Sequence, residues 1–294
     1  MYEVLYLPYL NKKHNDFYIC KSINGKHQIL KKLGKIPKAE AEQKLAEYKP
    51  KYEKQKNRIE NKINNLNEYK KRHGTPYDIW DFKERGEGGD KTFHGNTSPK
   101  VVRQLLLMLT KPLDHVVDPM AGSGTTIDVC EKLGRNCNAF DLNPTRDEIE
   151  EQDATQPFSL ENPADLFFVH PPYWNMVRYS NKRNDLSCTS TVGDYYRLLQ
   201  QSLKNAYDNI KGNGWIVVQQ GDMVQDGRFY PLCSETYQIL KEIGFIPHHE
   251  IIKLAHGDTS RKKSGMLVAE YVWQNQWKIS HDRILVFKKP NGSR

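Results

Sequence analysis

The chain has 294 residues, of which 27% are charged and 37% hydrophobic, and this apolar content is enough for a folded core and excludes wholesale disorder. No apolar run reaches the roughly 20 residues of a membrane-spanning helix, and the N-terminus does not read as a signal peptide. The five cysteines lack C-x-x-C spacing, so we expect no metal site, no disulfide framework and a cytoplasmic location.

The net charge of +8 is concentrated at the N-terminus. Residues 1–75 contain 18 lysines and arginines against 8 acidic residues, whereas the remainder is close to neutral. A basic module attached to a near-neutral body favours a polyanionic partner, most simply nucleic acid. A lysine-rich helix that is merely solvated would give the same pattern, so charge alone leaves that alternative open.

The sequence predicts two domains, residues 1–75 and residues 76–294. In the first, strands are expected near residues 2–7, 17–20 and 28–30, the last two joined by an Asn-Gly turn. A long helix should follow Pro37 and be interrupted at Pro50. Three strands and a helix loosely resemble the arm-type DNA-binding domains of phage integrases. The competing interpretation is a helical packing or dimerisation arm.

Strands and helices alternate from about residue 76 onward. Strands are expected at residues 116–118, 138–141, 165–170, 215–219 and 286–287, and helices at residues 101–110, from 125, at 194–211 and at 231–244. Such alternation predicts a mainly parallel sheet that is covered on both faces.

A nine-residue string, DPMAGSGTT from Asp118 to Thr126, stands between an expected strand and an expected helix. Its glycines would let the backbone approach a ligand, and the helix N-terminus would offer free N–H groups to a carboxylate. The residues expected to bind a cofactor here are Asp118, Pro119, Ala121, Gly122, Ser123, Gly124 and Thr125. About 20 residues on, Asp141 ends the next strand and could take both ribose hydroxyls of a nucleoside.

A second string, His170-Pro171-Pro172-Tyr173, directly follows an apolar strand. A side-chain acceptor and a carbonyl of a rigid Pro-Pro turn can hydrogen-bond the two N–H groups of an exocyclic amine. Those bonds would draw the nitrogen lone pair out of conjugation with the ring and make the amine nucleophilic. Tyr173 could stack on an extruded base.

Both strings resemble those of the DNA amino-methyltransferases, which modify N4 of cytosine or N6 of adenine, and the resemblance covers roughly residues 76–290. It implies an α/β, Rossmann-like fold with a mainly parallel seven-stranded sheet, S-adenosyl-L-methionine as cofactor and double-stranded DNA as partner. In this family an acidic residue at the place of Asp153 meets the cofactor adenine. The segment around His94 and Thr97 closes over its methionine part, although Gly95 replaces the proline usual after that histidine.

His170 departs from the family pattern, in which Asp, Asn or Ser precedes Pro-Pro-Tyr. A neutral imidazole still offers one acceptor nitrogen, whereas the protonated ring offers none. We therefore expect activity to fall as the pH drops through the pKa of this histidine. A profile that is flat between about pH 5.5 and 8 would argue against the role. The substitution also removes the clue to base identity, so N6 of adenine is favoured over N4 of cytosine only because it is more common.

DNA contacts are expected from basic and aromatic residues in two segments near the second string. They are Trp174, Arg178, Lys182, Arg183, Arg261, Lys262 and Lys263. Two other functions stay open, an RNA base N-methyltransferase and a catalytically inactive DNA-binding protein of the same fold. A homodimer, an association with the nucleoid and a restriction–modification role are compatible with the sequence.

Overall fold

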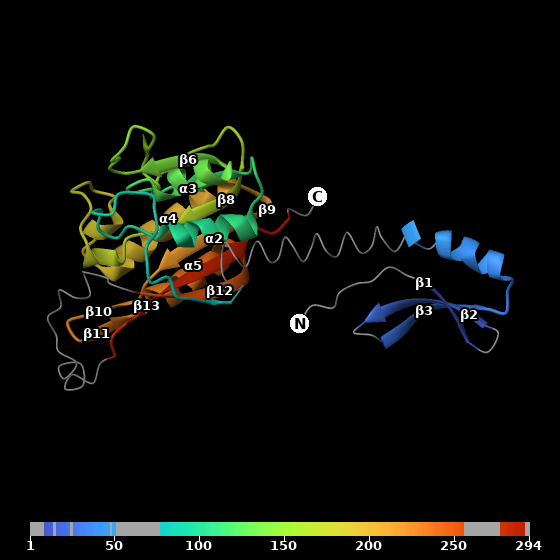
Figure 1. The fold of residues 1–294 in the computed structure, drawn as a ribbon. Coiled ribbons are helices and arrows are strands. Elements are labelled where there is room, and N and C mark those ends of the chain that lie inside the picture. The colour runs from blue at the N-terminus through green and yellow to red at the C-terminus, as the bar shows by residue number, and fades with distance from the viewer. Residues whose placement is uncertain are drawn as a thin grey trace. The chain divides into compact units, whose positions relative to one another are not determined.

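The computed structural model describes residues 9–13, 16–23, 26–47, 49–50, 77–255 and 277–291. The chain divides into two compact units, Met1–Pro76 and Tyr77–Arg294 (Figure 1). The first unit contains an antiparallel three-stranded sheet in the order β1-β2-β3. These strands are β1 (Tyr9–Lys13), β2 (Asp16–Ile23) and β3 (Lys26–Gly34).

The sequence-based expectations for the first unit are tested only in part. A helix begins at residue 38, directly after Pro37, as the proline predicts. The strand expected at residues 2–7, the Asn-Gly turn at residues 24–25 and the helix beyond residue 50 lie outside the described residues.

The second unit is built on an eight-stranded, mainly parallel sheet, as expected of a Rossmann-like α/β fold. Its order is β4-β12-β13-β9-β8-β5-β6-β7. The strands are β4 (Ile79–Trp80), β5 (His115–Asp118), β6 (Asn136–Asp141), β7 (Glu150–Glu151), β8 (Ala164–Val169), β9 (Ile210–Gln220), β12 (Ile246–Leu254) and β13 (His281–Lys288). β13 runs antiparallel to both neighbours. Seven strands were predicted, and the short β4, paired in parallel with β12, is the eighth.

Helices cover both faces of this sheet because its strands are apolar on both sides. Along β8, Phe167 and Val169 pack in the cluster that contains α4 (Val192–Asn209) and α5 (Leu232–Ile243). Leu166 and Phe168 point the other way, into the cluster with α2 (Pro99–Leu109) and α3 (Thr125–Leu133). This alternation is the period of two that a strand imposes on its side chains.

The chain reverses its direction of travel across the sheet at β5. From β5 it passes through α3 to β6 and β7 on one side, then crosses to β8 and β9 on the other. Parallel sheets of this kind bind ligands outside the carboxyl ends of the strands at the point of reversal. The polar ends of β5, β6, β8 and β9 therefore mark the place of the site.

Smaller elements follow the carboxyl ends of the strands. The 3₁₀ turns η1 (Trp174–Met176) and η2 (Leu186–Cys188) come after β8, and the hairpin of β10 (Met223–Gln225) and β11 (Arg228–Tyr230) comes after β9. The sequence did not predict this hairpin. Among the described helices, none is long and apolar enough to cross a membrane.

Candidate active site

The turn between β5 and α3 depends on two glycines in the left-handed region. Gly122 has φ of 53° and Gly124, which precedes the first residue of α3, has φ of 78°. Side chains other than glycine adopt these angles at a cost of about 1–2 kcal/mol. A Cβ atom on Gly122 would also lie 3.0 Å from the ring of Phe93. The absence of a side chain at Gly122 thus lets this turn pack closely against the Phe93 ring.

Asp118, the last residue of β5, is almost fully buried. Its carboxylate accepts a hydrogen bond from the Thr126 hydroxyl at 2.5 Å and one from the backbone N–H of Met120 at 3.1 Å. Burial raises the pKa of Asp118 to about 7, and these two hydrogen bonds oppose that shift. Both carboxylate oxygens of Asp118 therefore hold the turn by hydrogen bonds to residues on either side of its glycines.

Asp141 ends β6 beside the turn. Its two oxygens accept the backbone N–H groups of Gly122 and Asn143, each at 2.8 Å. Burial raises the pKa of Asp141, against the effect of these two hydrogen bonds. Each carboxylate oxygen has a second lone pair, so Asp141 can still accept the two hydroxyls of a ribose.

A loop that the sequence did not single out closes over the glycine turn. The Arg85 guanidinium donates to the carbonyl oxygens of Gly88 at 2.6 Å and Thr97 at 3.2 Å, and to the Thr125 hydroxyl at 3.3 Å. The Thr125 hydroxyl in turn donates to the Asn96 side chain at 2.6 Å. No local motif announces these contacts, because Arg85 and Thr125 lie 40 residues apart in the chain.

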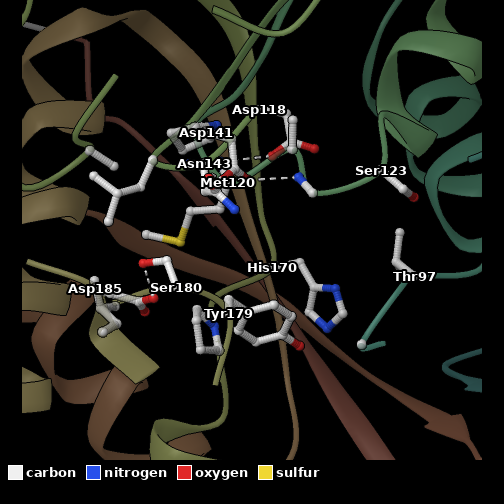
Figure 2. Close-up of a pocket in the computed structure, with 18 of the residues that line it drawn as sticks. Thr97, Asp118, Met120, Ser123, Asp141, Asn143, His170, Tyr179, Ser180 and Asp185 are labelled. Atoms are coloured by element: carbon white, nitrogen blue, oxygen red, sulfur yellow. Dashed lines mark hydrogen bonds between the residues drawn. The ribbon is translucent and has the colours of Figure 1, made fainter. Parts of the chain in front are cut away.

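The first cavity opens above the turn and has about 950 Å³ of empty space, including its mouth. Figure 2 shows Thr97, Asp118, Asp141 and His170 around it. The hydroxyl of Ser123, in the middle of the turn, is buried and has no hydrogen-bond partner among the described residues. A buried polar atom of this kind marks a place where a bound ligand would supply the partner.

The far end of this cavity is formed by residues after β7 and around η2. Asp153 accepts both the backbone N–H (2.9 Å) and the hydroxyl (2.7 Å) of Thr155, and the side-chain amide of Asn184 at 2.7 Å. Lys182 pairs with Glu151 and donates to the Leu142 carbonyl at 2.5 Å. Lys182, which was predicted to bind DNA, thus has its ammonium group engaged by these two neighbours.

His170 follows the last residue of β8 and borders the first cavity. Its Nε2 atom lies 3.2 Å from the Tyr173 hydroxyl, and its ring meets the Tyr173 ring edge-on. Burial lowers the pKa of His170 to about 4; the nearby Lys253 lowers it further, and Asp282 opposes the shift. The imidazole is therefore neutral at physiological pH and keeps one acceptor nitrogen.

The Pro171-Pro172 turn rests on a buried chain of hydrogen bonds. The Tyr195 hydroxyl donates to the Pro172 carbonyl at 2.8 Å and accepts from the Gln220 amide at 2.6 Å. Thr236 completes the chain by donating to the Gln220 oxygen at 2.6 Å. Tyr195, Gln220 and Thr236 are fully buried, so the carbonyl of Pro172 is held in one orientation.

A second cavity, with about 1600 Å³ of empty space including its open mouth, also borders His170. Its wall includes the aromatic rings of Tyr173, Tyr179 and Phe93. His94, predicted to contact the cofactor, is exposed and borders this second cavity, whereas Thr97 borders the first. His170, Phe93, Gly95, Asn96 and Tyr179 border both cavities.

The residues predicted to contact DNA differ in their exposure to solvent. Trp174 is buried, donates from its indole N–H to the Thr189 carbonyl at 3.3 Å and packs against Tyr230. Its burial thus leaves almost no surface for the predicted contact with DNA. Arg178 and Arg183 are exposed. Arg261, Lys262 and Lys263 lie outside the described residues.

The comparison with protein families gives one match, to a family described as DNA methylase, over residues 2–152. The matched range contains the glycine turn and Asp141 and ends before the His170 string. No curated protein sequence matches the chain.

Several solved structures resemble the chain weakly. TrmN from Thermus thermophilus is 16% identical over 65% of this chain, with a TM-score of 0.41, and the match spans about half (49%) of the TrmN chain. A candidate methyltransferase from Bacillus halodurans is 14% identical over 65% of this chain and 99% of its own, with a TM-score of 0.42. A candidate DNA modification methylase from Thermus thermophilus, complexed with S-adenosyl-L-methionine, is 20% identical over 48% of this chain and 55% of its own, with a TM-score of 0.32.

Gly122→Ala should destabilise the protein more than Gly134→Ala. Both glycines have similar positive φ angles, 53° and 66°, so both variants pay the same backbone strain of about 1–2 kcal/mol. Only at Gly122 does the new methyl group meet a neighbour, the Phe93 ring, whereas at Gly134 nothing lies within 4 Å. Urea unfolding measures both free energies. Equal losses of unfolding free energy in the two variants would show that the Phe93 ring does not restrict the space at Gly122.

Tyr195→Phe should lower the free energy of unfolding by about 1–3 kcal/mol, because it leaves the Pro172 carbonyl and the Gln220 amide buried without their partner. The control is Tyr196→Phe, which makes the same change at the adjacent, half-buried tyrosine. We expect the control to stay within about 0.5 kcal/mol of the wild type in the same urea measurement. A Tyr195→Phe protein as stable as its control would contradict the role of this chain.

Proposed function

Because the chain belongs to the DNA methylase family, we propose that it transfers a methyl group from S-adenosyl-L-methionine to an exocyclic amine of a base in double-stranded DNA. The observation that carries this proposal is the position of His170, which borders both cavities at the carboxyl end of β8. One cavity then holds the methyl donor and the other holds a base that has been extruded from the duplex.

The first cavity fits the cofactor by the chemistry of its walls. Asp141 would accept the ribose hydroxyls, and Asp153 stands at the far end, where an adenine amine would lie. The Ser123 hydroxyl, without a partner among the described residues, and the N–H groups at the start of α3 suit the methionine carboxylate. When bound, the sulfonium supplies an electrophilic methyl group, so transfer to a neutral amine releases one proton and leaves a neutral thioether.

The protein's contribution is to hold the amine and make it nucleophilic. A neutral His170 accepts one N–H of the amine, and a carbonyl of the Pro171-Pro172 turn accepts the other. The network beneath Pro172 prevents this turn from shifting during the reaction, which keeps the amine aligned. Tyr173 and Tyr179 provide aromatic faces against which an extruded base can stack. N6 of adenine remains favoured over N4 of cytosine.

DNA affinity is assigned in part to the basic N-terminal module. The excess of positive charge in residues 1–75 suits a phosphate backbone, and the exposed Arg178 and Arg183 suit phosphates as well. Val177 and Tyr179, the neighbours of Arg178 in the chain, border the second cavity.

Incubation with unmethylated mixed-sequence duplex DNA and methyl-labelled S-adenosyl-L-methionine tests the proposal. After digestion of the DNA, we expect the label in N6-methyladenine or N4-methylcytosine. Label on a parallel RNA sample alone would establish an RNA base methyltransferase instead. Label on neither, with the cofactor bound in stoichiometric amount, would make the chain an inactive DNA-binding protein.

The pH–rate profile should be flat between about pH 5.5 and 8 and fall only as the pH approaches 4. The pKa of His170 is lowered to about 4, so the imidazole keeps its acceptor nitrogen through the upper range. The sequence placed this loss at an ordinary histidine pKa, and burial moves it downward. The folded state also disfavours the charged ring, so the contribution of His170 to stability should decline as the pH falls from about 6.5 towards 4, whereas the raised pKa of Asp118 acts in the opposite direction.

The role of the imidazole can also be tested by measuring kcat of the His170→Leu variant. It removes the acceptor at every pH and should lower kcat at least about a hundredfold. His248→Leu makes the same change at an exposed histidine of β12, outside the residues that border either cavity, and should leave kcat unchanged. A wild-type rate that falls steeply between pH 8 and 6, or a His170→Leu protein of full activity, would contradict the role of the imidazole.

A further inference from the structure

The second cavity contains a buried ion pair that the proposed chemistry has not used. Asp282, near the start of β13, lies directly opposite Lys253 of β12 in the strand register. The Lys253 Nζ atom is 2.9 Å from the Asp282 Oδ2 atom, and the two side chains are only 18% and 8% exposed. Gln219 of β9 donates to the same carboxylate oxygen at 3.3 Å. Asp282 is thus held from two adjacent strands.

This ion pair lies close to the catalytic string. Asp282, Lys253 and His170 all border the second cavity, and the charges of Asp282 and Lys253 act on His170. A Cβ atom on Gly221 would lie 3.0 Å from the Asp282 Oδ1 atom and 2.7 Å from the Tyr173 ring. The missing side chain at Gly221 therefore lets the carboxylate and the aromatic ring share one wall.

The pair is also connected to the first cavity. Thr97 borders the first cavity, and its hydroxyl donates to the side-chain oxygen of Gln219 at 2.6 Å. The amide nitrogen of Gln219 donates in turn to Asp282. Thr97 and Gln219 are both buried. A continuous chain of polar groups therefore passes from the cofactor side of His170 to the base side.

His170 and the Pro171-Pro172 turn each accept one N–H of the amine, and a third acceptor can take part only by sharing one of these two N–H groups in a three-centre hydrogen bond. The neutral ring of His170 has one acceptor nitrogen, whereas a carboxylate has two oxygens with about four lone-pair positions. Asp282 can thus accept from a ligand while it also accepts from Lys253 and Gln219. An ammonium group beside it offers donors to an acceptor on the same ligand.

Resting on the proposed function, we propose that Asp282 accepts an N–H of the target amine while Lys253 donates to the ring nitrogen next to it. Adenine and cytosine both carry an amine beside an unprotonated ring nitrogen. Thymine carries a carbonyl oxygen beside a ring N–H, which is the reverse pattern, and guanine carries the same reverse pattern at O6 and N1. The ion pair therefore selects an edge with an amine beside an unprotonated ring nitrogen and rejects these keto edges, whichever of the two amino bases is modified.

The test compares DNA with and without the amine. We would take a short duplex that the wild type methylates and replace the target base by its analogue without the amine, purine for adenine or pyrimidin-2-one for cytosine. Binding would be measured by fluorescence anisotropy with S-adenosylhomocysteine present, so that no methyl transfer occurs. Loss of a buried charged hydrogen bond should weaken wild-type binding about tenfold or more.

Asp282→Ala should distinguish the two duplexes less than the wild type does, because only His170 and the Pro171-Pro172 turn still accept from the amine, and it should lose at least about tenfold in kcat on the normal duplex. Glu250→Gln is the control, because Glu250 of β12 forms an ion pair across the same two strands, with Arg283 of β13, and its carboxylate lies 2.5 Å from the guanidinium. Neither residue of that pair borders either cavity. The control should keep the preference for the amine and the wild-type kcat.

The folded state of each variant would be checked by thermal unfolding and by binding of S-adenosyl-L-methionine. If Asp282→Ala does not fold, the double variant Asp282→Asn with Lys253→Gln keeps the size and removes both charges. That variant should still bind the cofactor but lose its preference for amino over keto bases at the target position.

The outcomes separate the two proposals. If the wild type methylates DNA and Asp282→Ala behaves like Glu250→Gln, the role of Asp282 is overturned while the proposed function stands. If the folded wild type methylates no DNA, the proposed function falls, and the assignment of Asp282 falls with it.

Discussion

The site depends on one constraint, the burial of parallel strands on both faces. Strands such as β8 have room for apolar side chains only, so polar groups can stand only where the strands end. The reversal of the strand order at β5 brings several of these ends together. Asp118, Asp141, His170 and Gln219 thus come to border adjoining cavities although they lie far apart in the sequence.

Burial also determines what these groups can do. It raises the pKa of Asp118 and Asp141 and lowers that of His170, in each case by penalising the charged form. The lowered pKa keeps His170 neutral, so that it retains an acceptor nitrogen at physiological pH. The resembled family has Asp, Asn or Ser at this position, and each of these accepts hydrogen bonds at ordinary pH. An exposed histidine would lose its acceptor over a wider pH range.

Much of the fold could be predicted because it rests on local signals. The apolar run of β8, the glycines before α3 and the acidic ends of β5 and β6 can all be recognised in a short stretch of sequence. The contacts of Arg85, Tyr195 and Asp282 could not be predicted, since each joins segments far apart in the chain. Trp174 shows a different difficulty. An aromatic residue next to the His170 string is compatible in sequence both with a contact to a DNA base and with a place in the core, and the structure buries it.

The two margins of the large sheet have a consequence for the behaviour of the protein in concentrated solution. Each margin ends in a strand of two residues, β4 and β7. β12 pairs with β4 only at Ile252 and Lys253, and its earlier part carries Pro247, an irregular register and the acidic Glu250. Short strands, prolines, bulges and charges all hinder the addition of a foreign strand. The described margins of the large sheet are therefore protected against edge-to-edge aggregation.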